Sequence, residues 1–199
     1  GSFGKIGCFS AHPLKNLNAI GDAGFLTTSN IKIYNTIMDL KNHGMTSDRN
    51  KIKKFGYVSR MDNLQAAVLN YRLIKLNKVI AIRRRNVQYY KKYLNLDNVF
   101  VPDEEQYQFN TYHTFVIQVN KRDQLKEYLR KNGIVTAIHY PIPIHLQPAA
   151  KFLGYKKGNF PFAEKQAKRI LTLPINQFLK KQEIRIISNK INRFYEKNL

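Results

Sequence analysis

The chain has 199 residues, of which 43% are hydrophobic, and 34 lysines and arginines against 13 aspartates and glutamates give it a formal net charge of +21. This composition suffices for one or two compact units with an apolar core, and the charge predicts a polyanionic ligand or an acidic remainder of the protein. No long apolar run or leader peptide marks membrane insertion or secretion, and a single cysteine excludes an internal disulfide, so we expect a cytoplasmic protein without a bound metal.

The N-terminal stretch places a lysine between two short apolar runs. Ile6–Phe9 and Gly24–Thr28 are predicted as buried strands, so Lys15 lies on a tight connection, and Cys8 is expected as a small core residue. A poorly solvated lysine gives up its proton more readily, and the neutral amine attacks carbonyl carbons. Ser10 offers a hydroxyl to an anion nearby. The alternative is an ordinary surface lysine on a hairpin.

Helical periodicity dominates the next part of the chain. Residues 31–42 are predicted as a helix that ends at Gly44, and residues 45–54 are polar, basic and without periodicity, which is typical of a loop. A capping-box spacing that begins at Ser59 predicts the start of a long helix, and apolar residues three or four apart extend it over residues 60–94.

The following residues have the pattern of a small α/β module. Asn95–Asn110 is acidic and turn-forming, which indicates a crossing into a second unit. His113–Val119 alternates as a strand does, a helix capped by Asn120 is predicted to end at Gly133, and Ile134–His139 is predicted as a second strand.

A proline-rich run follows this module. Its three prolines, at 141, 143 and 148, exclude a regular helix or a central strand and predict a stiff loop. Such a loop with His139, Tyr140 and His145 on it is suited to binding a polar ligand, and a packed corner of proline and aromatic residues is the alternative. Beyond it, an apolar helix face over residues 163–171 and a terminal amphipathic helix over residues 182–194 are predicted.

Three sequence motifs extend this interpretation. They are SAHPLKNLNAIGDAGFLTT at residues 10–28, SRMDNLQAA at residues 59–67 and HYPIPIHLQP at residues 139–148. Together they resemble the DegT/DnrJ/EryC1/StrS family of sugar-nucleotide aminotransferases, which use pyridoxal phosphate (PLP). The resemblance covers essentially the whole chain.

The resemblance implies roles for individual residues. Lys15 matches the family lysine that links covalently to the PLP aldehyde, and Ser10 matches a serine that binds the PLP phosphate. His139, Tyr140 and His145 match a loop near the sugar-nucleotide pocket and are candidate substrate contacts. The aspartate that pairs with the PLP ring nitrogen is not assigned to any residue of this chain.

The second motif departs from the family at one position. Val58 stands where the family has an asparagine that reaches the PLP phosphate of the partner subunit, and a valine side chain cannot donate a hydrogen bond. Either Ser59 or a backbone amide takes over this contact, or the phosphate is held differently. For Arg60 and Gln65, a role in the site and packing at the helix start both remain open.

The resemblance also implies a fold and a function. The chain is expected to be the C-terminal half of an α/β, type I PLP-dependent aminotransferase, with the end of the large PLP-binding domain and a long connecting helix at 1–95 and a small C-terminal α/β domain at 96–199. The implied reaction is transfer of an amino group, from glutamate, to a nucleotide-linked keto-sugar, by a homodimer in cell-surface polysaccharide or amino-sugar biosynthesis.

Two alternatives to this function remain. One is a catalytically incomplete fragment or remnant of such an enzyme. The other is a basic nucleic-acid-binding module, which the charge of +21 suggests and which would bind with a steep dependence on salt. The lysines are scattered along helical segments, and no zinc-finger spacing, GXXG clamp or aromatic RNA-binding signature is found, so we expect no nucleic-acid partner.

Overall fold

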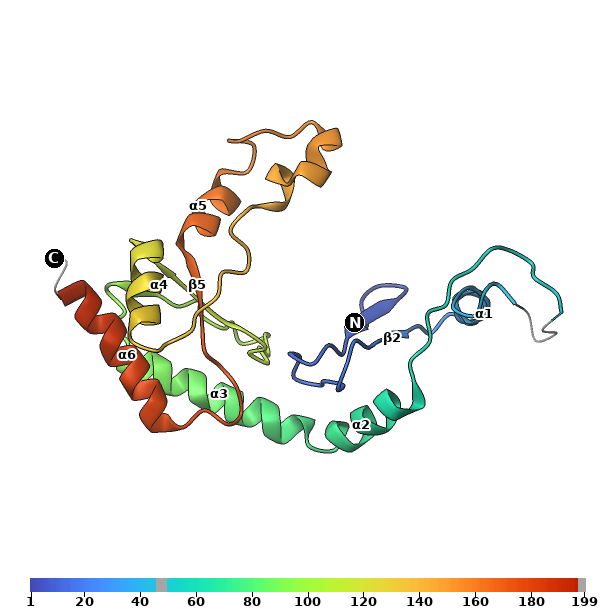
Figure 1. Cartoon of the computed structure of the whole chain (residues 1–199), viewed down its shortest axis with the longest axis horizontal. Helices are drawn as coiled ribbons and strands as arrows, with labels where there is room; N and C mark the ends of the chain where they lie inside the picture. Colours follow the sequence, from blue (N-terminus) through green and yellow to red (C-terminus); the bar gives the residue numbers. More distant parts are fainter. Residues whose placement is uncertain (46–49, 197–199) are drawn as a thin grey trace. The chain divides into compact units, whose positions relative to one another are not determined.

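The computed structural model describes residues 1–45 and 50–196, and its chain divides into two compact units, Gly1–Asn77 and Lys78–Leu199 (Figure 1). Part of the predicted loop at residues 45–54 therefore lies outside the described residues. The expected boundary after residue 95 differs from this division. Residues 78–95 belong to the second unit because Val87, Tyr90 and Leu94 are buried in its core.

The first unit begins with a two-stranded antiparallel ribbon. Strands β1 (Gly7–Ser10) and β2 (Gly24–Thr27) pair from Gly7 with Thr27 to Ser10 with Gly24, which confirms the two predicted strands. The prediction that they are buried is wrong, because the ribbon buries only Gly7. Cys8 is exposed, so its predicted place in a core is also wrong.

Helices follow the ribbon. Helix α1 (Ile31–Leu40) confirms the predicted helix, and the side chain of Asn30 caps it by accepting from two backbone N–H groups. Helix α2 (Asn63–Leu73) starts without a side-chain cap, so the predicted capping box is wrong. The predicted helix over residues 60–94 is two helices, α2 and α3 (Leu76–Tyr93), because a tight turn with a bond from the Lys75 N–H to the Arg72 carbonyl ends α2.

The second unit is built on a three-stranded antiparallel sheet. Its strands are β3 (Val99–Phe100), β4 (Phe115–Val119) and β5 (Ile170–Leu173), with β4 in the centre. Strand β4 confirms the strand predicted at residues 113–119, and every second side chain of it is buried.

The structure contradicts two predictions for the residues around strand β5. Helix α5 (Pro161–Arg169) stops before the residues that pair with β4, so the predicted helix face at residues 163–171 is wrong at its end. The strand predicted at Ile134–His139 is also wrong, since its Ala137 makes only an isolated bridge to Thr172. Pairing with the central strand and burial of Leu171 and Leu173 override the local helical pattern of these residues.

Helices α3, α4 (Arg122–Lys131) and α6 (Lys181–Glu196) complete the core of the second unit. Helix α6 confirms the predicted terminal helix. Gly133 ends α4 as predicted, at a φ of 75°, whereas the predicted cap Asn120 is wrong because Lys121 occupies that position without a side-chain bond. Side chains with no exposed surface join sheet and helices: Val87, Tyr90, Ile117, Val119, Leu125, Leu129, Leu171, Ile184 and Ile191.

Candidate active site

The lysine loop, residues 11–23, connects β1 to β2 and is closed by backbone hydrogen bonds. The Ala11 N–H donates to the Ala23 carbonyl, and the Ala19 N–H donates to the Ala11 carbonyl, both at 2.8 Å. Ala11 and Ala19 are 0% and 1% exposed. Lys15 is half-buried, and its backbone N–H donates to the His12 carbonyl at 2.8 Å. The structure thus places Lys15 on the connection predicted for it, partly shielded from water.

Helix α2 holds the lysine loop through two long side chains. Gln65 accepts a hydrogen bond from the backbone N–H of Ile20 at 2.9 Å. Arg72 donates from Nη1 to the carbonyls of Asn18 and Ala19, at 2.8 and 3.1 Å. Gln65 therefore supports the loop from the helix, and Arg72 shares this role. Sequence reasoning missed Arg72 because a helical arginine in a strongly basic chain has the pattern of a solvated residue.

We expect Gln65→Ala to weaken the attachment of the lysine loop to helix α2. The Ile20 N–H loses its acceptor, and since a hydrogen bond contributes about 1 kcal/mol, its amide exchange should accelerate roughly fivefold. Hydrogen exchange of residues 16–24, followed by NMR or mass spectrometry, measures the effect. Gln88→Ala, at an exposed position of α3, is the matched control. Equal exchange rates at Ile20 in the wild type and Gln65→Ala would contradict the assigned contact.

A pocket of about 1210 Å³ adjoins one end of the lysine loop and includes Ser10. Its polar lining residues are Cys8, Ser10, Thr27, Thr28, Tyr34, Lys41 and Ser59, and no carboxylate lines it among the described residues. The Ser10 hydroxyl oxygen accepts from the His12 N–H at 3.4 Å, so its own hydrogen can be donated to another group. Hydroxyl donors and one lysine make this pocket suitable for an anion. Lys15 is not among the residues that line it.

The residues around Val58 show which groups are available in place of the asparagine that the family has at this position. Val58 is exposed, and its backbone forms a bridge to Asn42. The backbone N–H of Ser59 donates to the Lys41 carbonyl at 3.0 Å, so this amide is already engaged. The Ser59 side chain lines the same pocket as Ser10. Arg60 is exposed, and its Nη1 donates to the side-chain oxygen of Asn42 at 3.4 Å.

The second unit brings the other three predicted site residues to one pocket. The proline-rich run forms two short 3₁₀ helices, η1 (Ile144–Leu146) and η2 (Pro148–Leu153). His139, Tyr140 and His145 line a pocket of about 580 Å³, which is within the range of roughly 300–1,000 Å³ that is usual for small-molecule sites. His139 Nδ1 lies 2.9 Å from the Thr172 hydroxyl, which anchors this residue to β5. Tyr140 is exposed, and His145 is buried.

His145 has a carboxylate partner that sequence reasoning missed. Its Nε2 lies 3.0 Å from Oε1 of Glu164, on α5. The pKa of Glu164 is lowered, first by the hydrogen bond from the Gly158 N–H and then by His145. A glutamate in the first turn of a helix is common, so no local signal distinguished Glu164.

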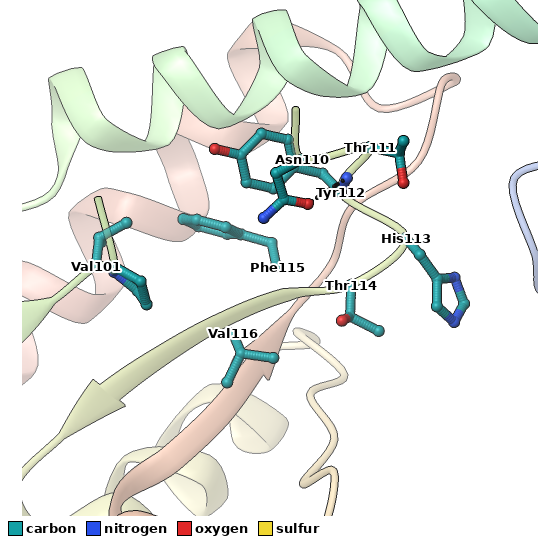
Figure 2. A pocket seen from close by; sticks show the side chains of 9 residues that line it. Val101, Asn110, Thr111, Tyr112, His113, Thr114, Phe115 and Val116 are labelled. Atoms are coloured by element: carbon teal, nitrogen blue, oxygen red, sulfur yellow. Dashed lines mark hydrogen bonds between the residues drawn. The ribbon is translucent and has the colours of Figure 1, made fainter. Parts of the chain in front are cut away.

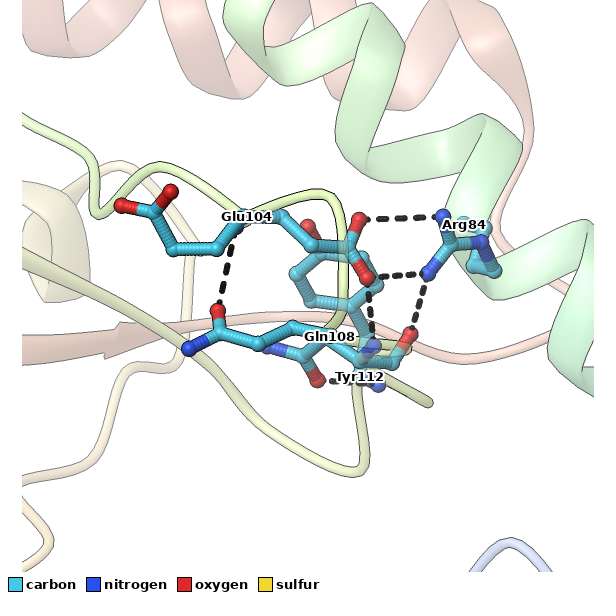
Figure 3. Close-up of polar contacts among 6 residues, drawn as sticks. Arg84, Glu104, Gln108 and Tyr112 are labelled. Atoms are coloured by element: carbon cyan, nitrogen blue, oxygen red, sulfur yellow. Dashed lines mark hydrogen bonds and ion pairs between the residues drawn. The ribbon is translucent and has the colours of Figure 1, made fainter.

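A second polar network orders residues 103–113 (Figure 3). Arg84, on α3, binds both carboxylate oxygens of Glu104, at 2.6 and 2.9 Å, and donates to the Asn110 carbonyl at 2.8 Å. The guanidinium also lies over the Phe109 ring, 4.4 Å from its centroid. These contacts tie the segment before β4 to helix α3.

This segment borders a smaller pocket of about 260 Å³ (Figure 2). Tyr112 and Phe115, which belong to the core of the second unit, line it, and the His113 side chain points away from Phe115. The volume lies below the usual range of small-molecule sites. We therefore assign this pocket to packing.

We expect the Arg84–Glu104 pair to make stability depend on acid pH. The pKa of Glu104 is below its ordinary value of 4.5, first because Arg84 hydrogen-bonds to it and second because the Asn110 N–H does. A lowered folded-state pKa stabilises the fold above the unfolded pKa, and this stabilisation is lost as the pH falls through the folded pKa.

The difference in melting temperature between the wild type and Glu104→Gln measures this effect. It should be constant above about pH 5.5 and shrink as the pH falls below about 4.5. Glu105→Gln, at the neighbouring exposed position, is the control. A difference that persisted unchanged to about pH 2.5 would show that the charge of Glu104 contributes nothing.

Residues 1–45 and 50–196 contain neither a cluster of metal-binding side chains nor a membrane-spanning helix. No group of three or more histidine, cysteine, aspartate or glutamate side chains is placed to hold a metal ion. No helix in this part of the chain has the length and apolar character needed to cross a membrane.

Known proteins of similar sequence and structure match nearly the whole chain. The chain is 37% identical to a UDP-N-acetyl-3-dehydro-alpha-D-glucosamine 3-aminotransferase of Acidithiobacillus ferrooxidans over 88% of its length and 47% of the relative. It is 36% identical to a pleiotropic regulatory protein of Geobacillus stearothermophilus, over 90% of its length and 49% of the relative. The crystal structure of a Brucella abortus DegT/DnrJ/EryC1/StrS aminotransferase superimposes with a TM-score of 0.89 at 32% identity, covering 96% of this chain and 51% of that one.

These matches settle the fold and the family. The chain spans about half the length of the curated relatives that it matches. Its mixed α/β architecture is that of part of a PLP-dependent aminotransferase of this type. The sequence profile of the DegT/DnrJ/EryC1/StrS aminotransferase family matches residues 1–192. The chain therefore belongs to the DegT/DnrJ/EryC1/StrS aminotransferase family.

Proposed function

We propose that this chain is part of a PLP-dependent aminotransferase that transfers an amino group, with glutamate as the donor, to a nucleotide-linked keto-sugar. The observation that carries the proposal is the lysine loop, in which Lys15 sits on a closed connection held by α2. The named activity of the Acidithiobacillus ferrooxidans relative supports a UDP-linked 3-keto-sugar as the class of acceptor. The product would serve amino-sugar or cell-surface polysaccharide biosynthesis.

The side chains of the first unit fit PLP by their chemistry. PLP needs an amine for covalent attachment and hydrogen-bond donors for a dianionic phosphate. Lys15 supplies the amine, and its loop is fixed at both ends and along its middle. Ser10 supplies a hydroxyl at the end of β1, in a pocket that four other hydroxyl side chains and a lysine also line. We assign the phosphate to Ser10, with Ser59 in place of the asparagine that Val58 replaces.

Lys15 has two tasks in this proposal. Its amine holds the cofactor covalently before the reaction. Once released, the free Lys15 amine would act as general base and acid: it would remove the proton from the carbon of the amino donor that bears the nitrogen, and it would give a proton to the carbon of the keto-sugar that receives the nitrogen. PLP, when bound, supplies the aldehyde that receives the amino group and the ring that withdraws electrons from the reacting carbon.

The second unit supplies the substrate contacts. His139, Tyr140 and His145 line the pocket of about 580 Å³, and we assign the nucleotide-linked sugar to it. The Thr172 hydroxyl and the Glu164 carboxylate orient the two histidine rings. As in the family that the chain resembles, the working enzyme is proposed to be a homodimer.

Amination of a defined keto-sugar tests the function. The chain is incubated with PLP, glutamate and UDP-N-acetyl-3-dehydro-glucosamine, and mass spectrometry follows the aminated sugar and 2-oxoglutarate. A parallel sample is reduced with borohydride, and peptide mass spectrometry locates the pyridoxyl group. We expect label on Lys15 and stoichiometric formation of both products. Label on other lysines only, or a labelled Lys15 without amination, would contradict the proposal.

A further inference from the structure

Glu164 joins three segments around the pocket of about 580 Å³. Its Oε1 accepts a hydrogen bond from the backbone N–H of Gly158 at 2.7 Å and lies 3.0 Å from Nε2 of His145. Its own backbone N–H donates to the Phe160 carbonyl at 3.0 Å. The side chains of Glu164 and His145 are only 13% and 8% exposed, so the pair is largely shielded from water.

The charge of Glu164 decides which nitrogen of His145 carries a proton. The lowered pKa of Glu164 keeps its carboxyl group ionised at neutral pH, and a carboxylate only accepts hydrogen bonds. The 3.0 Å contact therefore requires a proton on Nε2 of His145. In the neutral imidazole, Nδ1 is then an acceptor.

Aromatic contacts fix the plane of this imidazole. The His145 and Phe160 rings have centroids 4.8 Å apart, and Tyr155 meets Phe160 edge-on at 5.0 Å. The three rings line the pocket, and most of its other walls are aliphatic. His145 is the most deeply buried of the polar side chains that line it. A polar ligand group that enters deeply therefore has His145 as its main side-chain partner.

We infer that Glu164 is a positioning residue that holds His145 with its proton on Nε2, so that Nδ1 accepts a hydrogen bond from a sugar hydroxyl. A phosphate group does not fit this position, because its ionised oxygens are acceptors and offer no hydrogen to Nδ1. The inference rests on the proposed function, which makes a nucleotide-linked sugar the ligand of this pocket. It assigns the sugar ring, and not the diphosphate, to His145.

NMR shows directly which ring nitrogen of His145 carries the proton. Long-range ¹H–¹⁵N NMR spectra of the chain labelled with ¹⁵N-histidine distinguish the two neutral forms, and His145→Gln assigns the signal. We expect the Nε2–H form in the wild type and in Glu164→Asp, which keeps a carboxylate. Glu164→Gln should give a mixture of both forms, because an amide both donates and accepts. Glu127→Gln removes an exposed carboxylate paired with Arg130 on α4 and should leave the His145 signal unchanged.

Kinetics give the second readout. For UDP-N-acetyl-3-dehydro-glucosamine, Glu164→Gln should raise KM roughly tenfold with kcat unchanged, since a hydrogen bond of binding is weakened. Labelling of Lys15 by PLP should also be unchanged. A wild-type His145 protonated on Nδ1 overturns the inference, and so does a Glu164→Gln variant that moves neither the NMR signal nor KM. The NMR spectrum of the wild type does not depend on catalysis. If His145 is in the Nε2–H form but the chain aminates no keto-sugar, only the proposed function is contradicted.

Discussion

Replacing Lys15 with alanine is expected to abolish covalent attachment of PLP and to lower the rate of amination by roughly 10³-fold or more. The variant loses the amine that holds the cofactor and the base that moves the substrate proton. The absorbance band that PLP gives when it is linked covalently to Lys15 should disappear. Pyridoxyl label should be missing from the peptide that contains residue 15 after borohydride reduction. Absorbance titration with PLP, reduction with mass mapping, and the amination assay measure the three effects.

Lys32→Ala is the matched control for this experiment. Lys32 lies on the first turn of α1 in the same unit, and the chain loses the same charge. The Lys32→Ala variant should show the same absorbance band, the same pyridoxyl label and the same rate of amination as the wild type. A Lys15→Ala variant that kept a band of wild-type intensity would show that another amine holds PLP, and the assignment of the active-site lysine would be wrong.

Phe115→Ala is expected to cause a large loss of stability in the second unit. Phe115 is 2% exposed, stacks on Tyr90 with ring centroids 5.0 Å apart and meets Tyr112 edge-on at 6.3 Å. Truncation leaves a cavity between β4 and α3 that these rings cannot fill. The free energy of unfolding should fall by about 3–5 kcal/mol. Urea denaturation followed by far-UV circular dichroism measures it.

The control is Phe162→Ala, which removes the same side chain from a position that is 83% exposed. Its effect on the free energy of unfolding should stay within about 0.5 kcal/mol. If Phe115→Ala and Phe162→Ala had equal effects, the described packing between the sheet and α3 would not contribute to stability.

The sequence alone determined the features that are encoded locally. A helix or strand shows its period within about ten residues, so the helix at residues 31–42, the strand at 113–119 and the terminal helix could all be predicted. The motif around Lys15 is equally local, because the lysine, its serine and the glycine-rich turn lie within one short run. These residues also carried the resemblance that predicted the family.

Only the tertiary structure decided which distant residues meet. Arg72 and Asn18 are 54 positions apart, and His145 and Glu164 are 19 apart, so no local pattern pairs them. The same holds for β5, whose residues continue a helical pattern but pair with the central strand β4. Burial and hydrogen bonding across the fold outweigh local propensities of a few tenths of a kcal/mol per residue. The candidate lysine was therefore predicted from the sequence, and the groups that contact its loop and His145 were found only in the folded chain.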